Sequence, residues 1–365
     1  MVGWTAPVAT GVATEAVATH TSGAVRALEQ DLQRWVPPAR LAPIGVTSTD
    51  GTVSELQSFN WSGYADATTD QPVTTCGQGD GCGSVSSVTG TWTIPAVSCP
   101  APPYRNEDQY VAQWVGIDGF NDQTVEQAGS ASYCYEGTAA YYNWFELYPA
   151  ATVVLGPTSC INNNVGCPQP GDRITVTITV QPGSSGNDNY EISLVDRNSP
   201  ANSGTTTQSC ATNVCFDNSA EWIVERPAYE PVPGAVLIVP LSYFGQTSFS
   251  DGSVVAGGRQ SSIGGYQPGV YDLNMIDASE TYYLACPEQR EPVGSLLLLP
   301  TSSSTPDPCA AVPPGGQGQG FSPGAASASA TNGNGNGGGN GNGGGNGNGN
   351  GGRGSSFNVS WDDSF

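Results

Sequence analysis

The chain has 365 residues, a formal net charge of −22 and a sequence pI of about 4.1, and it contains no lysine. Its acidity argues against nucleic acid or anionic membrane surfaces as partners, and the missing lysine excludes Schiff-base and P-loop chemistry. Its one histidine, His20, lies ahead of every strand-like pattern, so the core offers no histidine for a catalytic triad or a zinc site. Carboxyl groups remain for acid–base chemistry, and no metal or organic cofactor is expected.

Residues 1–56 differ from the rest of the chain and are expected to form a leader or pro-like segment. From Ser22 to Trp35 apolar residues recur at a helical spacing, and Pro37-Pro38 would end such a helix. The first residues lack a basic start and include Glu15, so a signal peptide is not evident. No run approaches the ~18 apolar residues of a transmembrane helix. A removable pro-segment and a solvated surface helix both fit this pattern.

From about Ser58 the pattern changes to short runs of alternating apolar and polar residues, separated by Gly, Pro, Asn and Ser clusters. Many short strands without helices between them favour an antiparallel β-sandwich. One domain, residues 57–310, is expected to hold these strands, since sandwiches reach about 200–250 residues. The expected strands are Phe59–Tyr64, Val88–Ile94, Gln109–Ile117, Tyr141–Tyr148, Ile174–Val180, Tyr190–Val195, Glu221–Val224, Ala235–Val239, Thr247–Phe249, Tyr271–Met275 and Thr281–Leu284.

Ten cysteines in an acidic, loop-rich chain indicate disulfide bonds and an oxidising, extracellular compartment. No CxxC spacing occurs and no histidine accompanies the cysteines, so a metal site is a poor alternative. Three close pairs are expected to form short clips, and the other four cysteines would then close longer loops. The expected pairs are Cys76–Cys82, Cys160–Cys167, Cys210–Cys215, Cys99–Cys134 and Cys286–Cys309.

The core pattern stops after Cys309, and residues 311–365 are expected to form a disordered, low-complexity tail. Residues 315–354 are nearly all Gly, Asn, Ser, Ala and Gln. Such a tract cannot bury enough apolar surface to offset the entropy that ordering would cost. The last residues, Phe357–Phe365, are more apolar and could dock on the domain, although terminal disorder is the expected state.

Carboxyl, amide and indole side chains recur in four of the strand-like segments. Polar groups are costly to bury, so several of them on strand faces suggest a working site, although each carboxylate alone also fits a solvated position. Alternate residues of a strand share a face. The groups that share a face are Trp114, Gly116 and Asp118; Trp144, Glu146 and Tyr148; Glu221, Ile223 and Glu225; and Val125 with Gln127, opposite Glu126.

Seven motifs stand in the order found in the glutamic peptidases, the eqolisin family of acid-acting endopeptidases, which this chain resembles from about Ser58 to Phe249. No single motif is decisive, but seven in order are specific. The resemblance implies a sandwich of two curved antiparallel sheets, concanavalin-like or jelly-roll-like, with a cleft on a concave face that binds extended peptides. The motifs are Asn60–Gly63, Val88–Pro95, Trp114–Gly119, Glu126–Gly129, Trp144–Pro149, Ala220–Glu225 and Pro240–Gly245.

The same resemblance implies that Gln127 and Glu221 are the catalytic pair. Glu221 would act as general base on a water that attacks the peptide carbonyl, and would then return the proton to the leaving nitrogen. Gln127 would orient the water and donate its amide hydrogens to the oxyanion. Trp114, Asp118 and Trp144 would line the cleft.

Glu146 would support the catalytic pair without taking part in the chemistry, and Trp61 and Trp222 are expected in the core. Tyr142 stands near the position where fungal members carry an aspartate, so one family carboxylate is absent or replaced by a phenol. Glu126 replaces an apolar neighbour of the glutamine. These departures leave subsite preference and pH optimum open.

The chain is therefore interpreted as a secreted endopeptidase of acidic surroundings, made as a zymogen, that acts as a monomer on proteins or peptides. Two alternatives remain at this stage. A non-catalytic binding module could use Trp114 and Trp144 as a ligand platform. A glycoside hydrolase could use Glu146 and Glu221 as its two carboxyl groups, but this interpretation leaves Gln127 without a role.

Overall fold

The computed structural model describes residues 35–36, 46–49, 54–67, 85–99, 109–135, 137–156, 166–181, 188–210, 215–232, 235–263, 269–276, 283–288 and 357–361. These residues are nearly all in β-strands, with one short 3₁₀ turn at Pro200–Asn202. None of the described residues belongs to a helix long and apolar enough to cross a membrane.

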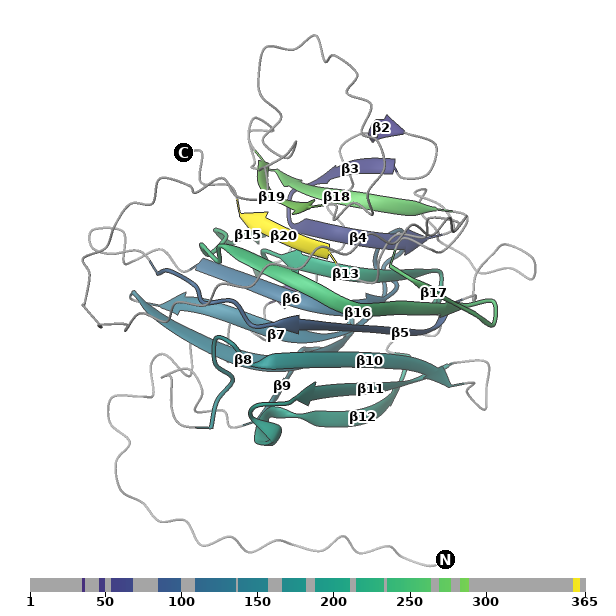
Figure 1. Ribbon diagram of the computed structural model, residues 1–365, viewed down its shortest axis with the longest axis horizontal. Coiled ribbons are helices and arrows are strands. Elements are labelled where there is room, and N and C mark those ends of the chain that lie inside the picture. The colour runs from purple at the N-terminus through teal and green to yellow at the C-terminus, as the bar shows by residue number, and fades with distance from the viewer. Residues whose placement is uncertain are drawn as a thin grey trace, which may run out of the picture.

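Two largely antiparallel layers form the body of the molecule (Figure 1). The inner sheet contains, in spatial order, β9 (Val153–Leu155), β8 (Thr138–Tyr148), β7 (Val125–Tyr135), β6 (Gln109–Ile117), β13 (Ser219–Glu225), β4 (Trp61–Ala67), β18 (Val270–Ile276) and β3 (Ser54–Ser58). β19 (Tyr283–Glu288) pairs with the last two residues of β18. The outer sheet contains β17 (Arg259–Ser262), β16 (Gln246–Ala256), β5 (Val85–Thr93), β10 (Arg173–Gln181), β11 (Asn189–Asp196) and β12 (Gly204–Ser209). The expected sandwich is confirmed.

The main core lies between the two sheets, because alternate strand residues point inward from both. Trp92, Ile178 and Phe249 from the outer sheet pack there with Val115 and Trp222 from the inner sheet. Trp222 is fully buried, and its Nε1 donates a hydrogen bond of 2.8 Å to the carbonyl oxygen of Thr89. A buried indole N–H needs such a partner. Its expected place in the core is confirmed.

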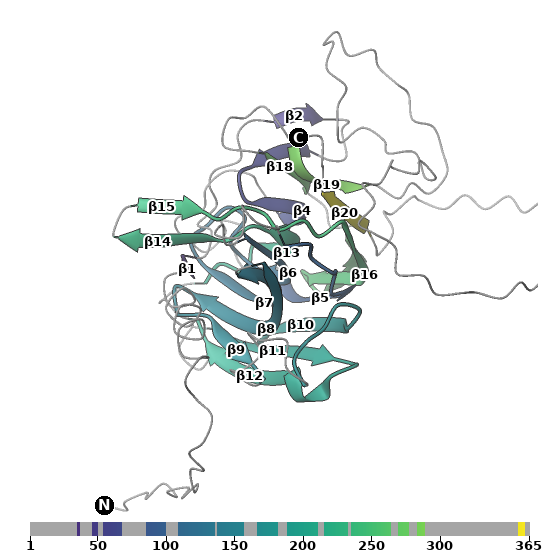
Figure 2. The same cartoon turned by 90° about the vertical axis from the view of Figure 1, so that its left-hand side faces the viewer.

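The N-terminal part of the chain adds three short strands. β1 (Trp35–Val36) pairs with β14 (Ala228–Val232) of the hairpin that β14 forms with β15 (Ala235–Ile238), and Figure 2 shows this hairpin projecting from the body. β2 (Val46–Thr49) pairs with β3 (Ser54–Ser58), which runs parallel to β18. The helix expected from Ser22 does not include Trp35, since Trp35 is in a strand and the proline after Val36 favours extended backbone. Residues 22–34 lie outside the described residues.

The C-terminal segment corrects the expected disorder of the chain end. Residues Phe357–Trp361 form β20, which pairs with β16 on one side and β19 on the other. Val359 at its centre is fully buried in the main core. The low-complexity composition was extended to the chain end, but the alternating Phe-Asn-Val-Ser-Trp of residues 357–361 offers a strand to two open sheet edges. Residues 289–356 lie outside the described residues.

Two of the expected disulfides are confirmed, each with an S–S distance of 2.05 Å: Cys99–Cys134 and Cys210–Cys215. Cys167 and Cys286 are also disulfide-bonded. Their expected partners, Cys160 and Cys309, and both members of the expected Cys76–Cys82 pair lie outside the described residues.

Candidate active site

A row of three polar side chains crosses the inner sheet on the face turned away from the outer sheet. The register places Glu221 of β13 opposite Gly116 of β6, Gly116 opposite Gln127 of β7, and Gln127 opposite Glu146 of β8. Residues directly opposite one another on neighbouring strands share a face of the sheet. Glu221, Gln127 and Glu146, called the polar row below, therefore lie on one face, although strand parity alone could not bring them together.

Gly116 lies between Glu221 and Gln127 in the polar row, and the Trp114 ring occupies the space where a side chain would stand. A Cβ atom at this position would lie 2.8 Å from Cζ3 of Trp114 and 3.4 Å from Cβ of Gln127. Glu221 and Gln127 stand on strands that are separated by two strand spacings of about 4.8 Å each. A glycine at the middle position therefore allows the Trp114 ring to pack between the two polar residues.

A second row lies beside the polar row and contains Ile223, Trp114, Gly129 and Trp144. Nε1 of Trp114 donates a hydrogen bond of 2.6 Å to Oε2 of Glu225, and the ring of Trp61 packs edge-on against it at 4.9 Å between centroids. These contacts hold the Trp114 indole against Gly116. Trp61 is buried as expected, but on the face of the polar row and not between the sheets.

A third row contains Glu225, Ala112, Ala131 and Tyr142. Glu225 thus shares the face of Glu221 and fixes one wall of the site through Trp114. No function for Glu225 was predicted from the sequence, although its position on the same strand face as Glu221 was an available signal. Tyr142, expected near the site, lies one row beyond Trp144 on the same strand.

Hydrogen bonds orient the amide of Gln127, while other polar atoms of the polar row have no well-placed hydrogen-bond partner. Its Nε2 donates to Oε2 of Glu146 at 2.8 Å, and Oγ1 of Thr152 donates to Oε1 of Glu146 at 2.7 Å. Oε1 of Gln127 has no hydrogen-bond partner among the described residues, and neither carboxyl oxygen of Glu221 has a hydrogen bond of good geometry there. Buried polar atoms without partners are costly, so these three atoms are candidates to bind a water or a substrate.

Burial is the largest cause of the pKa shifts of the carboxyl groups in the site. It raises the pKa of Glu221 well above the usual range; the Ser219 hydroxyl opposes the shift, and the nearby carboxyl of Asp118 adds to it. Burial raises the pKa of Glu146 to about 7, although Thr152 and Gln127 donate hydrogen bonds to it. It raises the pKa of Glu225 to about 8. Both supporting carboxyl groups are therefore neutral in acid.

Asp118 lies just beyond the end of β6 and holds the segment that leads into β13. Its Oδ2 accepts hydrogen bonds from the backbone N–H groups of Phe216 and Asp217 at 2.7 and 2.9 Å, and its Oδ1 accepts one from Asn218 at 2.9 Å. Its φ of 67° lies in the left-handed region, which aspartate tolerates better than most residues. Asp118 therefore ties β6 to the strand of Glu221 from a position beside the polar row.

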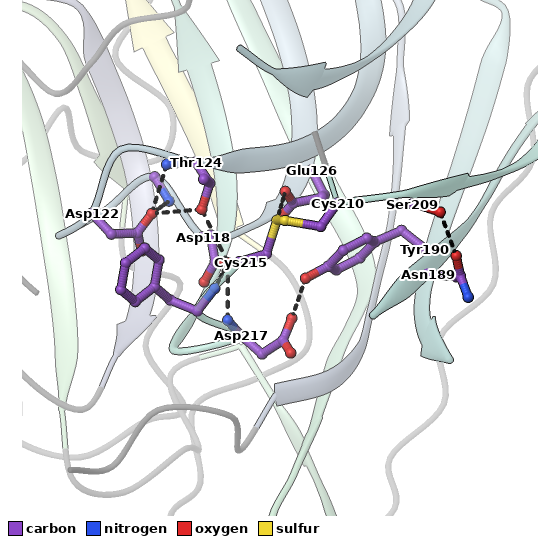
Figure 3. Close-up of a disulfide and its surroundings, with 12 residues drawn as sticks. Asp118, Asp122, Thr124, Glu126, Asn189, Tyr190, Ser209, Cys210, Cys215 and Asp217 are labelled. Carbon is purple, nitrogen blue, oxygen red and sulfur yellow. Dashed lines mark hydrogen bonds between the residues drawn. A yellow bond between two sulfur atoms is a disulfide. The ribbon is translucent and has the colours of Figure 1, made fainter. Parts of the chain in front are cut away.

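Asp118 belongs to a buried group of acids next to the Cys210–Cys215 disulfide, here called the carboxyl cluster: Asp118, Asp122, Glu126 and Asp217 (Figure 3). Oη of Tyr190 donates to Oδ1 of Asp217 at 2.6 Å. Oε1 of Glu126 lies 3.0 Å from Sγ of Cys215. A disulfide sulfur has no proton to donate, so any hydrogen bond there must come from a protonated Glu126.

Each acid of the carboxyl cluster has a raised pKa, with burial as the largest cause. Carboxyl neighbours add to the shift for Asp118, Glu126 and Asp217, and the pKa reaches about 6 for Asp122 and about 8 for Asp217. Glu126 is the residue of the cluster that departs from the family pattern in the sequence. Asp217 carries no such signal, because only the fold brings its segment to the end of β6.

The chain was compared with known protein families and structures. A model of the Peptidase A4 family matches residues 60–286. One similar solved structure is a scytalido-glutamic peptidase with a transition state analog inhibitor, at 19% identity over 63% of this chain and 93% of that chain, with a TM-score of 0.45. Another is the aspergilloglutamic peptidase from Aspergillus niger, at 21% identity over 49% of this chain and 93% of that chain, with a TM-score of 0.34. A search of curated proteins found no match.

Proposed function

The chain belongs to the Peptidase A4 family, the glutamic peptidases, and from this premise we propose that it is a secreted, acid-acting endopeptidase that uses Glu221 and Gln127. The observation that supports the assignment of these two residues is the polar row, in which Gly116 separates them on one sheet face. Membership of a peptidase family argues against a non-catalytic module. The hydrogen bonds that Glu146 accepts from Gln127 and Thr152 argue against its use as a free glycosidase acid.

In the proposed reaction Glu221 in its ionised form takes a proton from a water that enters the opened site between Glu221 and Gln127. The water oxygen attacks the peptide carbonyl carbon, and the carbonyl oxygen becomes an oxyanion. Oε1 of Gln127 accepts a hydrogen bond from the O–H that remains on the water oxygen, and the Nε2 hydrogen not used by Glu146 donates a hydrogen bond to the oxyanion. Glu221 then gives its proton to the leaving nitrogen, which breaks the C–N bond without a covalent intermediate.

Acid action is consistent with the charges around the site. Below the raised pKa values of Glu146 and Glu225, both groups are neutral and do not oppose the negative charge that forms on Glu221 or on the oxyanion. Burial is the main reason why the pKa of Glu221 is raised, so entry of water lowers that pKa. Glu221 can then ionise in mild acid while its neighbours stay protonated.

The zymogen proposal is supported by the burial of the polar row in the full-length chain. Glu221, Gln127 and Glu146 are 0%, 2% and 3% exposed, which leaves a substrate no access to them. We propose that removal of about the first 50 residues opens the site. Their removal gives up two short ladders, the two-residue pairing of β1 with β14 and the three-residue pairing of β2 with β3.

One experiment tests both activity and maturation. The protein is held at pH 3–4, its new N-terminus is sequenced, and the treated protein is incubated with acid-denatured haemoglobin in the presence of pepstatin. We expect loss of about 50 N-terminal residues and pepstatin-resistant cleavage of the substrate. Processed, folded protein that leaves the substrate intact from pH 2 to 6 would refute the proposed activity, and full activity with Met1 intact would refute the maturation step.

Glu146 provides a separate test of the hydrogen-bond chain. In Glu146→Ala the amide of Gln127 loses its acceptor and can rotate, and misplacement of a catalytic group by about 1 Å can cost about 10²-fold in rate. We expect a fall in kcat of that order with little change in KM. Glu146→Gln keeps a carbonyl oxygen as acceptor and should retain most of the activity. Equal activity of both variants and the wild type would show that Gln127 does not depend on this bond.

A further inference from the structure

The strand β20 fills a gap between the two sheets of the sandwich (Figures 1 and 2). On one side, Phe357 to Ser360 lie opposite Phe249 to Gln246 of β16. On the other side, Asn358 to Trp361 lie opposite Glu288 to Ala285 of β19. This five-residue strand is therefore paired along both edges and joins the outer sheet to the inner one.

The floor of this gap belongs to the main core. Phe249 and Ala285 are fully buried and Cys286 is 8% exposed, and Val359 inserts among the same cluster with no exposed surface. Without β20 the edges of β16 and β19 would present unpaired backbone groups beside an apolar floor. This combination is the arrangement by which sheets bind an added peptide strand, with the backbone supplying affinity and a side-chain pocket supplying selectivity.

The connection to β20 differs from the other strand connections of the domain. β19 ends at Glu288 and β20 begins at Phe357, so residues 289–356 separate two strands that are direct neighbours. Much of this connection is the Gly- and Asn-rich tract, whose composition supplies no core-forming residues. In general, a Gly-rich linker sets an effective concentration of about the millimolar range for the segment that it tethers.

From these observations we propose that the edges of β16 and β19 form a strand-binding groove, and that its ligand is the chain's own segment around Val359, bound in an exchangeable manner. The ligand class is an extended peptide with an aliphatic residue at the position of Val359. The tether keeps the groove occupied in dilute solution. This inference is independent of the proposed peptidase mechanism.

The test uses the full chain with a site for a sequence-specific protease placed within residues 315–354, in a Glu221→Gln background that suppresses self-digestion. After cleavage, gel filtration at micromolar concentration shows whether the C-terminal fragment stays bound to the rest of the protein. A fluorescein-labelled peptide covering Ser355–Phe365 is then added, and its anisotropy is titrated against cut and uncut protein. A peptide with Val359→Asp is the matched control.

We expect saturable binding of the labelled peptide to the cut protein, at least tenfold weaker apparent binding to the uncut protein, and none of the Val359→Asp peptide. If the released fragment leaves on gel filtration, the Tm of the body should fall and the added peptide should restore it. A fragment that leaves without any change in Tm, a fragment that never exchanges, or equal binding of the Val359→Asp peptide would overturn the proposal.

Discussion

Glu221→Gln should reduce kcat for peptide hydrolysis at pH 3–4 by about 10³-fold or more, because no other group of the polar row can replace its carboxylate as a base. Gln127 does not titrate, and Glu146 accepts two hydrogen bonds and is neutral in acid, with its pKa raised to about 7. The exchange keeps the size of the side chain. The fold should therefore persist, and circular dichroism with thermal melting checks this.

Glu126→Gln is the matched control for this experiment. Glu126 is equally buried, and its strand neighbour is Gln127, but its side chain lies on the opposite face of β7. Its replacement should leave kcat at pH 3–4 within about twofold of the wild type. Substantial activity in folded Glu221→Gln, or equal losses in both variants, would show that the polar row is not the catalytic site.

The Tm of the protein should fall by about 10 °C or more between pH 4 and pH 8. The acids of the carboxyl cluster, together with Glu146 and Glu225, have pKa values raised above those of an unfolded chain, with burial as the main cause. The stability that such groups contribute is fully present below about pH 4. It is lost as the pH rises through their folded pKa values, which are about 6 for Asp122, about 7 for Glu146 and about 8 for Asp217 and Glu225.

The pKa shift of Glu146 alone shows how large the fall in Tm should be. A pKa of Glu146 that is raised from 4.5 to about 7 lowers the free energy of unfolding above pH 7 by roughly 3 kcal/mol. For a domain of this size each kcal/mol changes Tm by about 2–4 °C. Glu126→Gln should raise Tm at pH 7–8 relative to the wild type and leave it nearly unchanged at pH 4. Calorimetry across pH checks both expectations, and a Tm that is flat or rises from pH 4 to pH 8 would contradict them.

The strands with clear alternation could be predicted from the sequence. Gln109–Ile117 matches β6 in both bounds, and Ile174–Val180 falls within β10. β7 was recognised only at its first residues, because it is rich in Ala, Gly and Ser and nearly all of its residues are buried, so no alternation marks it. β12 was missed for the opposite reason: its residues are Gly, Thr, Gln and Ser, and it has no apolar face.

By itself the sequence determined the chemistry available to this protein and the faces on which its polar side chains stand. The chain has no lysine, its one histidine precedes every strand-like pattern, and its ordered motifs resemble those of a family in which a glutamate and a glutamine are the expected active groups. Strand parity is a local property of extended backbone, so it placed Glu221 with Glu225 and separated Gln127 from Glu126 before any fold was known.

Only the tertiary structure decided which faces meet. β13 enters between β4 and β6, far from its sequence neighbours, and this pairing sets Glu221 across Gly116 from Gln127. Burial and raised pKa values likewise depend on what packs against each group, and β20 depends on two edges formed by distant segments. Register between strands and the packing above them are set by the whole chain at once, which is why no local pattern could reveal them.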